Sequence, residues 1–529
     1  MSELKKMELL FKEGKITRRD FLARTASLAA LMSISPTMSS SLARAATPKK
    51  GGRLRMALWG GSTSDSLDPA TMAAQMPINV NWQIRNNVVE IDWTGKPNPE
   101  LAESFESTPD AATWIFKLRK GIEFHNGKAL DAEDVVFSIN HHRGDHSKSA
   151  AKGLVSAIKD IKADGKYTVI FKLKAGNADF PFILGDYHLS IVPAGTTGLG
   201  FEKGIGTGGY TLSSWEPGVR VLTKRNPNYW KEGCAHFDEV ETLGVADVTA
   251  RMNALMTGEV DLINRCEPKT ANLLEKRKNL QLIKTTGCMH YSFPMRCDMP
   301  PYDKKDVRLA LKYAVNREDL VERVLQGYGQ VGNDHPIAPF QRYFASELPQ
   351  REYDTDKARY HIKKAGMAGH IFKLHVSDGA FQGAVDAGIL YKEHAAKAGI
   401  NIEIVREPAD GYWNSVWRKK PWCASYWGGR ASEDMMLSLV YAADANWNDT
   451  QWKNDRFNRL LVEARAELDE AKRGEMYAEM QSILNEDGGA LIPMFAEYVY
   501  GASDRLRHDE ISGFGELDHG RCAEQWWFA

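Results

Sequence analysis

The chain has 529 residues, of which 43% are hydrophobic and 26% are charged, and its formal net charge is −1. This composition is ordinary for a soluble globular protein, and the lack of a basic tract excludes the charge pattern of proteins that bind nucleic acid or anionic lipid. Because a single hydrophobic core seldom serves so long a chain, we expect two or more domains.

The N-terminal segment has the layout of an export signal. Arg18 and Arg19 precede a mildly apolar run over residues 21–38, and residues 43–45 offer a small-residue cleavage site. The paired arginines indicate the twin-arginine route, so we predict that residues 1–45 are a signal peptide that is removed. The alternative is an ordinary amphipathic helix that contains Arg-Arg by chance. A membrane span would need about 20 predominantly apolar residues, and this run is shorter and interrupted by polar side chains.

Removal of this signal would change the charge and the location of the protein. It would take away eight Lys or Arg and four Asp or Glu residues, which leaves a net charge of about −5. No later apolar run is long enough to span a bilayer. We therefore expect a periplasmic protein that meets the cytoplasmic membrane only through its partners.

The six cysteines leave the disulfide pattern open. Fifteen complete pairings exist, and an oxidising compartment permits disulfides. Substrates of the twin-arginine route, however, generally fold before export in a reducing cytosol. No C-x-x-C motif occurs, so a zinc ribbon or a thioredoxin-type site has no support, and we expect at most one or two disulfides. The cysteines are Cys234, Cys266, Cys288, Cys297, Cys423 and Cys522.

Strands and helices alternate along the first half of the chain without a fixed period, so no repeat architecture is expected. Trp114, Phe116 and Leu118 fall on one face of residues 114–119, which predicts a half-buried strand. The Asp-Gly turn signal at 164–165 leads into a second predicted strand over residues 167–173. Between them, Asp131 is the predicted N-cap of a helix. The Pro-Gly pair at 217–218 is predicted to join two further strands.

From residue 303 onwards the pattern becomes mainly helical. Asn316 is the predicted N-cap of a helix that ends at Gly327. A long amphipathic helix is predicted over residues 457–484. The mixture indicates an α/β or α+β protein. The apolar stripe of the long helix consists of Leu460, Leu461, Ala464, Leu468, Met476, Met480 and Ile483.

A series of motifs runs through the chain that follows the signal. Residues 101–105 read LAESF, residues 114–128 read WIFKLRKGIEFHNGK and residues 131–138 read DAEDVVFS. These motifs, and their order, resemble those of the family 5 extracellular solute-binding proteins. That family contains the dipeptide-, oligopeptide- and nickel-binding receptors of ABC importers. Further matching segments lie at residues 206–210, 224–230, 251–261, 306–317, 353–358 and 472–481.

The resemblance implies an α/β fold with two lobes, a type II-like periplasmic-binding-protein clamp of the large cluster C form. Ligand is enclosed between the lobes, and a transporter senses their closure. The chain is expected to cross between the lobes near residues 289–291 and 492–495. We expect lobe I over residues 46–289 with an extra subdomain inserted at about 85–200, lobe II over 290–495, and a C-terminal return to lobe I over 496–529.

Other patterns that suggest chemistry have simpler interpretations. The glycine-rich residues 204–209 lack the Gly-Lys-Ser/Thr ending of a phosphate loop, which favours a backbone turn. His141, His142 and His146 stand in a charged stretch without a carboxylate pattern, which favours solvated surface over a metal site. No G-x-S-x-G or H-E-x-x-H motif occurs. We predict no catalytic residue, no metal site and no cofactor.

Tryptophan is the most suggestive residue type for binding. The chain has 14, and Trp59, Trp413 and Trp427 stand beside glycine or polar residues. A ring beside glycine can present a flat face to a ligand where the backbone approaches closely. The alternative for any one of them is ordinary core packing. For Trp427 ligand contact is favoured, because the family places its pocket on that loop.

The same loop departs from the pattern of the dipeptide receptors. In those receptors an Asp on this loop neutralises the α-ammonium of the peptide, whereas this chain has Gly429 followed by Arg430. They also hold the α-carboxylate with an Arg where this chain has Ser377 and Asp378. We expect a pocket of reversed polarity, in which Arg430 holds a carboxylate or phosphate and Asp378 accepts an ammonium or hydroxyl group.

The alternative for Arg430 is a structural ion pair with Glu433 or Asp434, which would only shape the loop. The residues predicted to bind ligand are Trp59, Tyr291, Asp378, Trp413, Trp427, Gly428 and Arg430.

These observations favour a monomeric periplasmic receptor that delivers a peptide or peptide-like solute to the permease and ATPase of an ABC importer. The same role for an opine, a sugar-containing solute or a metal–chelator complex is the alternative within this class. A secreted hydrolase is the alternative from another class, and the missing nucleophile–base motif weighs against it. A redox or cofactor carrier has only the export route in its favour.

Overall fold

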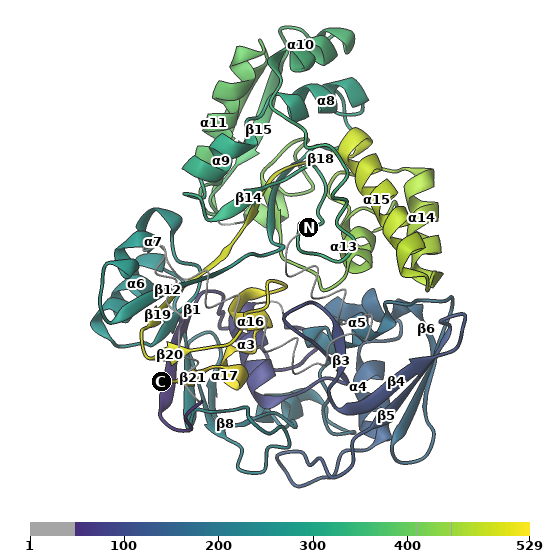
Figure 1. The fold of residues 1–529 in the computed structure, drawn as a ribbon, viewed down its shortest axis with the longest axis vertical. Coiled ribbons are helices and arrows are strands. Elements are labelled where there is room, and N and C mark those ends of the chain that lie inside the picture. The colour runs from purple at the N-terminus through teal and green to yellow at the C-terminus, as the bar shows by residue number, and fades with distance from the viewer. Residues whose placement is uncertain (1–47, 73, 410, 446) are drawn as a thin grey trace, which may run out of the picture. The chain divides into compact units, whose positions relative to one another are not determined.

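The computed structural model describes residues 48–72, 74–409, 411–445 and 447–529. The predicted signal peptide and its twin arginines lie outside the described residues. From Pro48 to Ala529 the chain forms one contiguous unit that is built around three sheets (Figure 1).

The largest sheet has seven strands in the order β12-β19-β11-β1-β10-β9-β8. β1 pairs in parallel with β10 and β11, and the outer strands pair antiparallel. Leu54, Met56 and Leu58 of β1 are buried in one core and Ala57 in another, as expected of a strand covered on both faces. The bounds of these strands and of three helices packed on them are β1 Arg53–Leu58, β8 Tyr210–Glu216, β9 Arg220–Arg225, β10 Glu239–Gly244, β11 Leu262–Ile263, β12 Leu280–Thr285, β19 Tyr498–Ser503, α3 Gln75–Ile84, α6 Val248–Thr257 and α7 Pro268–Glu275.

Glycine shapes two connections of this sheet. Gly218 has a φ of 71° and forms the turn between β8 and β9, which confirms the predicted Pro-Gly turn. In the glycine-rich segment 204–209, a Cβ on Gly206 would lie 2.1 Å from the carbonyl oxygen of Ile84 at the end of α3. The glycines of this segment therefore let two backbones pack closely.

A second sheet, of four antiparallel strands in the order β4-β5-β7-β6, lies within the stretch expected as an insertion. β5 and β7 confirm the two predicted strands. Asp131 and Asp134 form a capping box at the start of α4, as the sequence predicts. The elements here are β2 Val89–Ile91, β3 Pro97–Pro99, β4 Ala102–Ser107, β5 Thr113–Leu118, α4 Ala132–His141, η1 Ala150–Lys152, η2 Leu154–Ala157, β6 Ile158–Ala163, β7 Thr168–Leu173, α5 Phe180–Leu184, η3 Tyr187–Leu189 and η4 Gly198–Lys203.

The histidines that follow α4 correct one prediction. His142 is buried, where solvated surface is expected, and its Nδ1 lies 2.7 Å from the hydroxyl of Ser149. His141 is half-buried, pairs with Asp68 and stacks on Phe201. Asp145, His146 and Lys148, which follow His142 in the chain, are exposed, so only part of this charged stretch is solvated surface.

A third sheet has four strands in the order β14-β18-β13-β17, and the parallel pair β15-β16 lies beside it. Asn316 caps α9 as predicted, with its side chain accepting a hydrogen bond from Asp319 N, and Gly327 follows with a φ of 79°. The elements are β13 His290–Pro294, α8 Lys305–Tyr313, α9 Arg317–Arg323, β14 Gly329–Val331, α10 Thr355–Lys364, β15 Ile371–Val376, α11 Ala384–Lys397, β16 Asn401–Arg406, α12 Tyr412–Ser415, β17 Ser425–Trp427, α13 Glu433–Val440 and β18 Ala490–Ala496.

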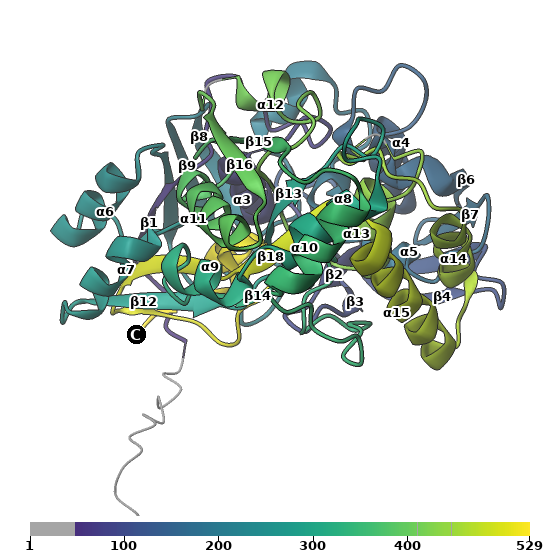
Figure 2. The ribbon, with the colours of Figure 1, turned by 90° about the horizontal axis from the view of Figure 1, so that it is seen from above.

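The predicted helix over residues 457–484 is two helices, α14 Asp455–Ala466 and α15 Glu470–Asp487 (Figure 2). Asp469 caps α15 by accepting hydrogen bonds from Ala471 N and Lys472 N, so the backbone turns at this point. Leu468 stands in the break and is 46% exposed, so its place in the apolar stripe is wrong.

The chain passes between the two larger groups of strands twice. It leaves the seven-stranded sheet after β12, enters the third sheet at β13, and returns between β18 and β19. Residues 289–291 include the start of β13 and residues 492–495 lie within β18, and these strands pair antiparallel, with His290 opposite Phe495. That the lobes hinge at these residues stays a prediction. The exact lobe boundaries stay predictions.

The C-terminal segment packs against the seven-stranded sheet and α3 (Figure 1). Tyr210 of β8 donates its hydroxyl to Ala523 O at 2.8 Å, and Arg521 pairs with the buried Glu100 at 2.9 Å. Its elements are β20 Leu506–Arg507, α16 Glu516–His519, α17 Cys522–Gln525 and β21 Trp527–Phe528.

Two further findings concern the whole described chain. Within the described residues, no helix combines the length and the apolar character that a membrane crossing requires. All six cysteines are free thiols in this structure.

Candidate functional site

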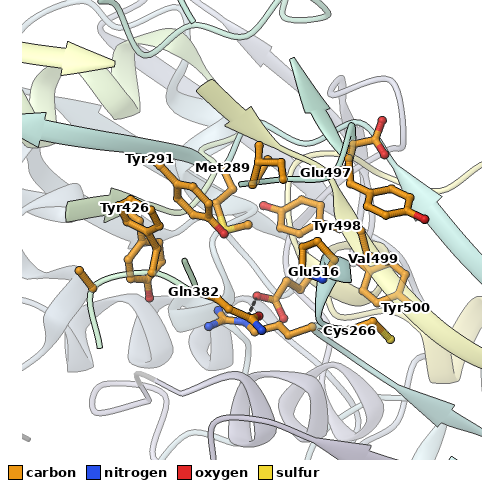
Figure 3. A pocket seen from close by; sticks show the side chains of 17 residues that line it. Cys266, Met289, Tyr291, Gln382, Tyr426, Glu497, Tyr498, Val499, Tyr500 and Glu516 are labelled. Carbon is orange, nitrogen blue, oxygen red and sulfur yellow. Dashed lines mark hydrogen bonds and ion pairs between the residues drawn. The ribbon is translucent and has the colours of Figure 1, made fainter. Parts of the chain in front are cut away.

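A cavity of about 90 Å³ lies where the chain passes between the sheets. Its walls come from both sides of the passage: Tyr291 from β13, Tyr426 from β17, Tyr498 from the start of β19 and Glu516 from α16 (Figure 3). Segments that are far apart in the sequence therefore meet here, because the crossing strands bring them together.

An ion pair borders the cavity on the side of the seven-stranded sheet. Arg265 Nε lies 2.6 Å from Glu516 Oε1, and the guanidinium carbon lies 3.8 Å from the centre of the Trp59 ring. Asn264 Nδ2 donates to the other Glu516 oxygen at 2.9 Å. Burial lowers the pKa of Arg265, but the Glu516 charge, together with contributions from Tyr426 and Tyr291, outweighs burial, so the net pKa shift of Arg265 is upward and its guanidinium stays charged. Trp59, a predicted ligand residue, is thus held beside the cavity by a cation–π contact.

Aromatic rings form the opposite wall. Tyr291 and Phe381 stack with ring centres 4.1 Å apart and an interplanar angle of 10°. Tyr426 lies on the strand next to Tyr291, since β13 and β17 place the two residues opposite one another. Such a wall is suited to the apolar or planar part of a ligand, while the ion pair supplies polar groups across from it.

The last residue of β17 and the loop that follows it supply three of the predicted residues, Trp427, Gly428 and Arg430. Trp427 is only 6% exposed, and its indole N–H donates to Asp449 Oδ2 at 3.2 Å. Gly428 has open space around it, because a Cβ there would meet only Arg430 Nη1, at 3.9 Å. A Cβ on Gly429 would instead lie 2.1 Å from Cys288 Sγ and 2.7 Å from a carbonyl oxygen of the C-terminal segment. The loop thus touches the other side of the passage at Gly429.

The alternative ion pairs of Arg430 are not present. Glu433 accepts a hydrogen bond from Tyr343 N at 2.9 Å, and Asp434 pairs with Arg465 at 2.7 Å. Arg430 Nη1 donates to the carbonyl oxygens of its own loop, at 2.8 and 3.2 Å. No described carboxylate forms an ion pair with it.

The electrostatic influence of Arg430 reaches one buried acid. Burial raises the pKa of Asp186, but the His188 ring, with a smaller contribution from Arg430, outweighs burial and brings the pKa below its usual value. Asp186 contacts His188 at 2.7 Å and forms no ion pair with Arg430.

Of the seven predicted ligand residues, only Tyr291 lines the cavity. Trp59 contacts the lining residue Arg265, and Trp427, Gly428 and Arg430 do not line the cavity. Asp378 is exposed and does not line it, although the neighbouring residues Ala380 and Phe381 do. Trp413 is 37% exposed and lines a different recess. Their roles in binding stay predictions.

The sequence gives no local signal for several residues that shape this region. Arg265 and Glu516 become neighbours only through the fold, and Phe381 is a lone aromatic residue between small ones. Asp449 is buried and accepts hydrogen bonds from the indoles of Trp417 and Trp427. Burial raises its pKa to about 6, against the opposing effect of the two indole N–H groups and the Arg418 charge.

In the part of the chain that the structure describes, no three His, Cys, Asp or Glu side chains gather in a way that could hold a metal ion.

Comparison with known proteins adds sequence relatives. The model of the family described as "Bacterial extracellular solute-binding proteins, family 5 Middle" matches residues 96–449. The chain is 28% identical over 455 residues to di/tripeptide-binding protein 1 of Pseudomonas aeruginosa strain UCBPP-PA14. This alignment covers 79% of this chain and 84% of the relative. The chain is also 26% identical over 470 residues to the glutathione-binding protein GsiB of Escherichia coli strain K12. That alignment covers 86% of this chain and 90% of the relative.

Comparison with solved structures tests the predicted fold class. The ABC transporter-associated periplasmic binding protein DppA from Helicobacter pylori, in complex with peptide STSA, matches with a TM-score of 0.78 at 23% identity. The match covers 90% of this chain and 99% of that one. The fold class is therefore confirmed as the mixed α/β fold of the cluster C periplasmic binding proteins.

Proposed function

We propose that this chain, which belongs to family 5 of the bacterial extracellular solute-binding proteins, captures a peptide or peptide-like solute and delivers it to the permease of an ABC importer. Members of this family are binding receptors of ABC transporters and not enzymes, so the alternative of a secreted hydrolase is wrong. Two relatives are named for di/tripeptides and for glutathione, which supports a peptide-like solute.

The observation that carries the proposal is the cavity whose walls come from both sides of the chain crossings. A solute bound there contacts both sides at once and therefore favours the arrangement in which they lie close together. About 90 Å³ has room for a few water molecules, whereas sites for small molecules usually span several hundred Å³. Entry of a peptide thus requires the two sides to separate, and we place the hinge at residues 289–291 and 492–495.

The charge of the loop after β17 supports a ligand with an acidic group. The guanidinium of Arg430 has no carboxylate partner among the described residues, and it stands on the loop that touches the other side at Gly429. A ligand carboxylate here would form charge-assisted hydrogen bonds with the planar guanidinium. We therefore propose that Arg430 binds an acidic group of the ligand.

The place of action also belongs to this proposal. The family acts outside the cytoplasmic membrane, and the paired Arg18 and Arg19 favour export by the twin-arginine route to the periplasm. There the receptor would work as a monomer and meet the permease and ATPase complex at the inner membrane.

The test starts with protein purified from its own host. Native mass spectrometry before and after mild denaturation reveals a co-purified solute as a difference in mass. We expect one chemically intact solute for each chain, since a receptor does not transform what it binds. A solute that is converted during incubation with the pure protein would contradict the receptor role.

The same solute then tests Arg430. In a calorimetric titration of emptied protein, we expect Arg430→Ala to weaken binding by about 2–5 kcal/mol, because the substitution leaves a ligand carboxylate buried without its partner. Arg277→Ala, at an exposed arginine that has no ion pair among the described residues, is the control. If the two variants bind the solute with equal affinity, Arg430 does not bind the ligand and only stabilises the loop.

A further inference from the structure

A second recess, of about 590 Å³, lies next to the loop before β17 and shares no lining residue with the first cavity. Its lining includes three cationic side chains, Arg296, Arg418 and Lys419, and no acidic one. We call it the Arg418 recess. The other residues of its wall are Trp413, Asn414, Trp417 and Gln451.

The three cations differ in their partners. Arg296 pairs with Asp298 at 2.6 Å and also donates to the carbonyl oxygen of Arg418 at 2.5 Å. Lys419 is exposed. Arg418 forms no ion pair with a described residue, and its buried Nε has no hydrogen-bond partner there. An anion in the recess would give the guanidinium of Arg418, which lines it, the charged partner that it lacks among the described residues.

The nearby acid Asp449 does not fill this role. Its Oδ2 accepts hydrogen bonds from the indoles of Trp417 and Trp427, at 3.3 and 3.2 Å, and it forms no ion pair with Arg418. Asp449 therefore fixes the orientation of the Trp417 ring, while the guanidinium of Arg418 lies 5.5 Å from the centre of that ring.

The backbone of the recess is held in an unfavourable conformation at two places. Arg418 has a φ of 60° and Gln451 a φ of 51°, a region that residues with a side chain seldom adopt. The carbonyl group of Arg418 is held by Arg296, and Gln451 Nε2 donates to Asn448 O at 2.6 Å. Strained residues of this kind gather at ligand sites, where the surrounding structure maintains them.

Aromatic rings connect the recess with the first cavity. Trp417 and Trp413 have ring centres 5.6 Å apart, and Trp413 is also 5.6 Å from Tyr426, which lines the cavity. Trp413 is 37% exposed and so offers its ring to a ligand. A solute that extends from the cavity can follow these rings to the guanidinium of Arg418.

We propose that the Arg418 recess binds a carboxylate group of the transported solute, with Arg418 as its main partner and the rings of Trp413 and Trp417 against the adjoining part. This subsite rests on the proposed receptor function. It implies that the preferred solute carries an acidic group at a distance from the end that sits in the first cavity, which selects against short neutral peptides.

The first experiment uses citrate as a probe for a carboxylate and needs neither the natural solute nor closure. We expect calorimetry at low ionic strength to show one citrate per chain, and Arg418→Gln to weaken its binding at least tenfold, since the variant removes the charge and keeps a polar side chain. Arg418→Lys should retain part of the affinity, and Arg277→Gln all of it. Absence of citrate binding, or equal affinity in all variants, would overturn the site.

The second experiment separates a subsite from a site for free anions. The co-purified solute, titrated into emptied protein, should bind Arg418→Gln at least tenfold more weakly than the wild type. Loss of citrate binding with unchanged solute affinity would overturn the subsite. If Arg418→Gln does not fold, Lys419→Gln replaces it in both titrations. We then expect a threefold loss of affinity, and unchanged affinities would count against the proposal. The citrate titration does not need a co-purified solute. Its outcome therefore tests the anion site separately from the receptor function.

Discussion

Gly429→Ala is expected to lower the free energy of unfolding by about 1–3 kcal/mol and to weaken solute binding. A methyl group at this position would lie 2.1 Å from Cys288 Sγ and 2.7 Å from a backbone carbonyl oxygen of the C-terminal segment. Neither neighbour is the movable end of a long side chain, because the thiol is buried and the carbonyl belongs to the main chain. The loop after β17 must then move away, and Arg430 moves with it.

Gly428→Ala is the matched control, since it adds the same methyl group one residue earlier in the same loop. Its Cβ would meet only Arg430 Nη1, at 3.9 Å, so we expect a change of less than about 0.5 kcal/mol in stability. Urea denaturation and titration of the co-purified solute measure both effects. If the two variants behave alike, the close approach at Gly429 does not matter for the loop.

Asp449→Asn is expected to stabilise the protein at pH 7 by up to about 3 kcal/mol. Burial raises the pKa of Asp449 to about 6, whereas an unfolded Asp has a pKa of about 4. Between these values the folded state binds the additional proton, so the free energy of unfolding falls as the pH rises from about 4 to about 6. Asn keeps an oxygen that accepts from the indoles of Trp417 and Trp427 and carries no charge.

Urea denaturation of wild type and variant between pH 4 and pH 8 measures this difference. The two proteins should have similar stability near pH 4, and the variant should gain its advantage as the pH approaches 6. Asp444→Asn, at an exposed carboxylate on the same loop, is the control and should change stability little at any pH. A variant curve that stays parallel to the wild-type curve would show that Asp449 carries no buried charge.

Local signals of the sequence predict much of the fold. Asp131 and Asn316 cap their helices as expected, because a cap depends on a few consecutive residues. The break before α15 is not predictable in this way. Asp469 reads like any exposed acid of an amphipathic helix, and the spacing of Leu468 fits the apolar stripe. That α14 and α15 are two helices and not one becomes visible only in the folded structure.

The candidate site is predicted less completely. Tyr291 follows from the expected crossing at 289–291, since a hinge strand borders the space between the lobes. Arg265 and Glu516 have no sequence signal, because their ion pair joins two distant segments that only the tertiary fold brings together. The buried acid Asp449 and the strained residue Arg418 are not predictable from the sequence for a similar reason. Burial and a positive φ are properties of the folded chain.

Small-angle scattering with and without the co-purified solute tests the central claim most directly, which is that two lobes close around a solute at the crossings of the chain. Bound solute should decrease the radius of gyration. It should also raise the free energy of unfolding by the mass-action term, about 2.7 kcal/mol at a hundredfold excess over Kd, and the melting temperature should rise as a result. An unchanged radius of gyration at saturating solute would contradict the clamp.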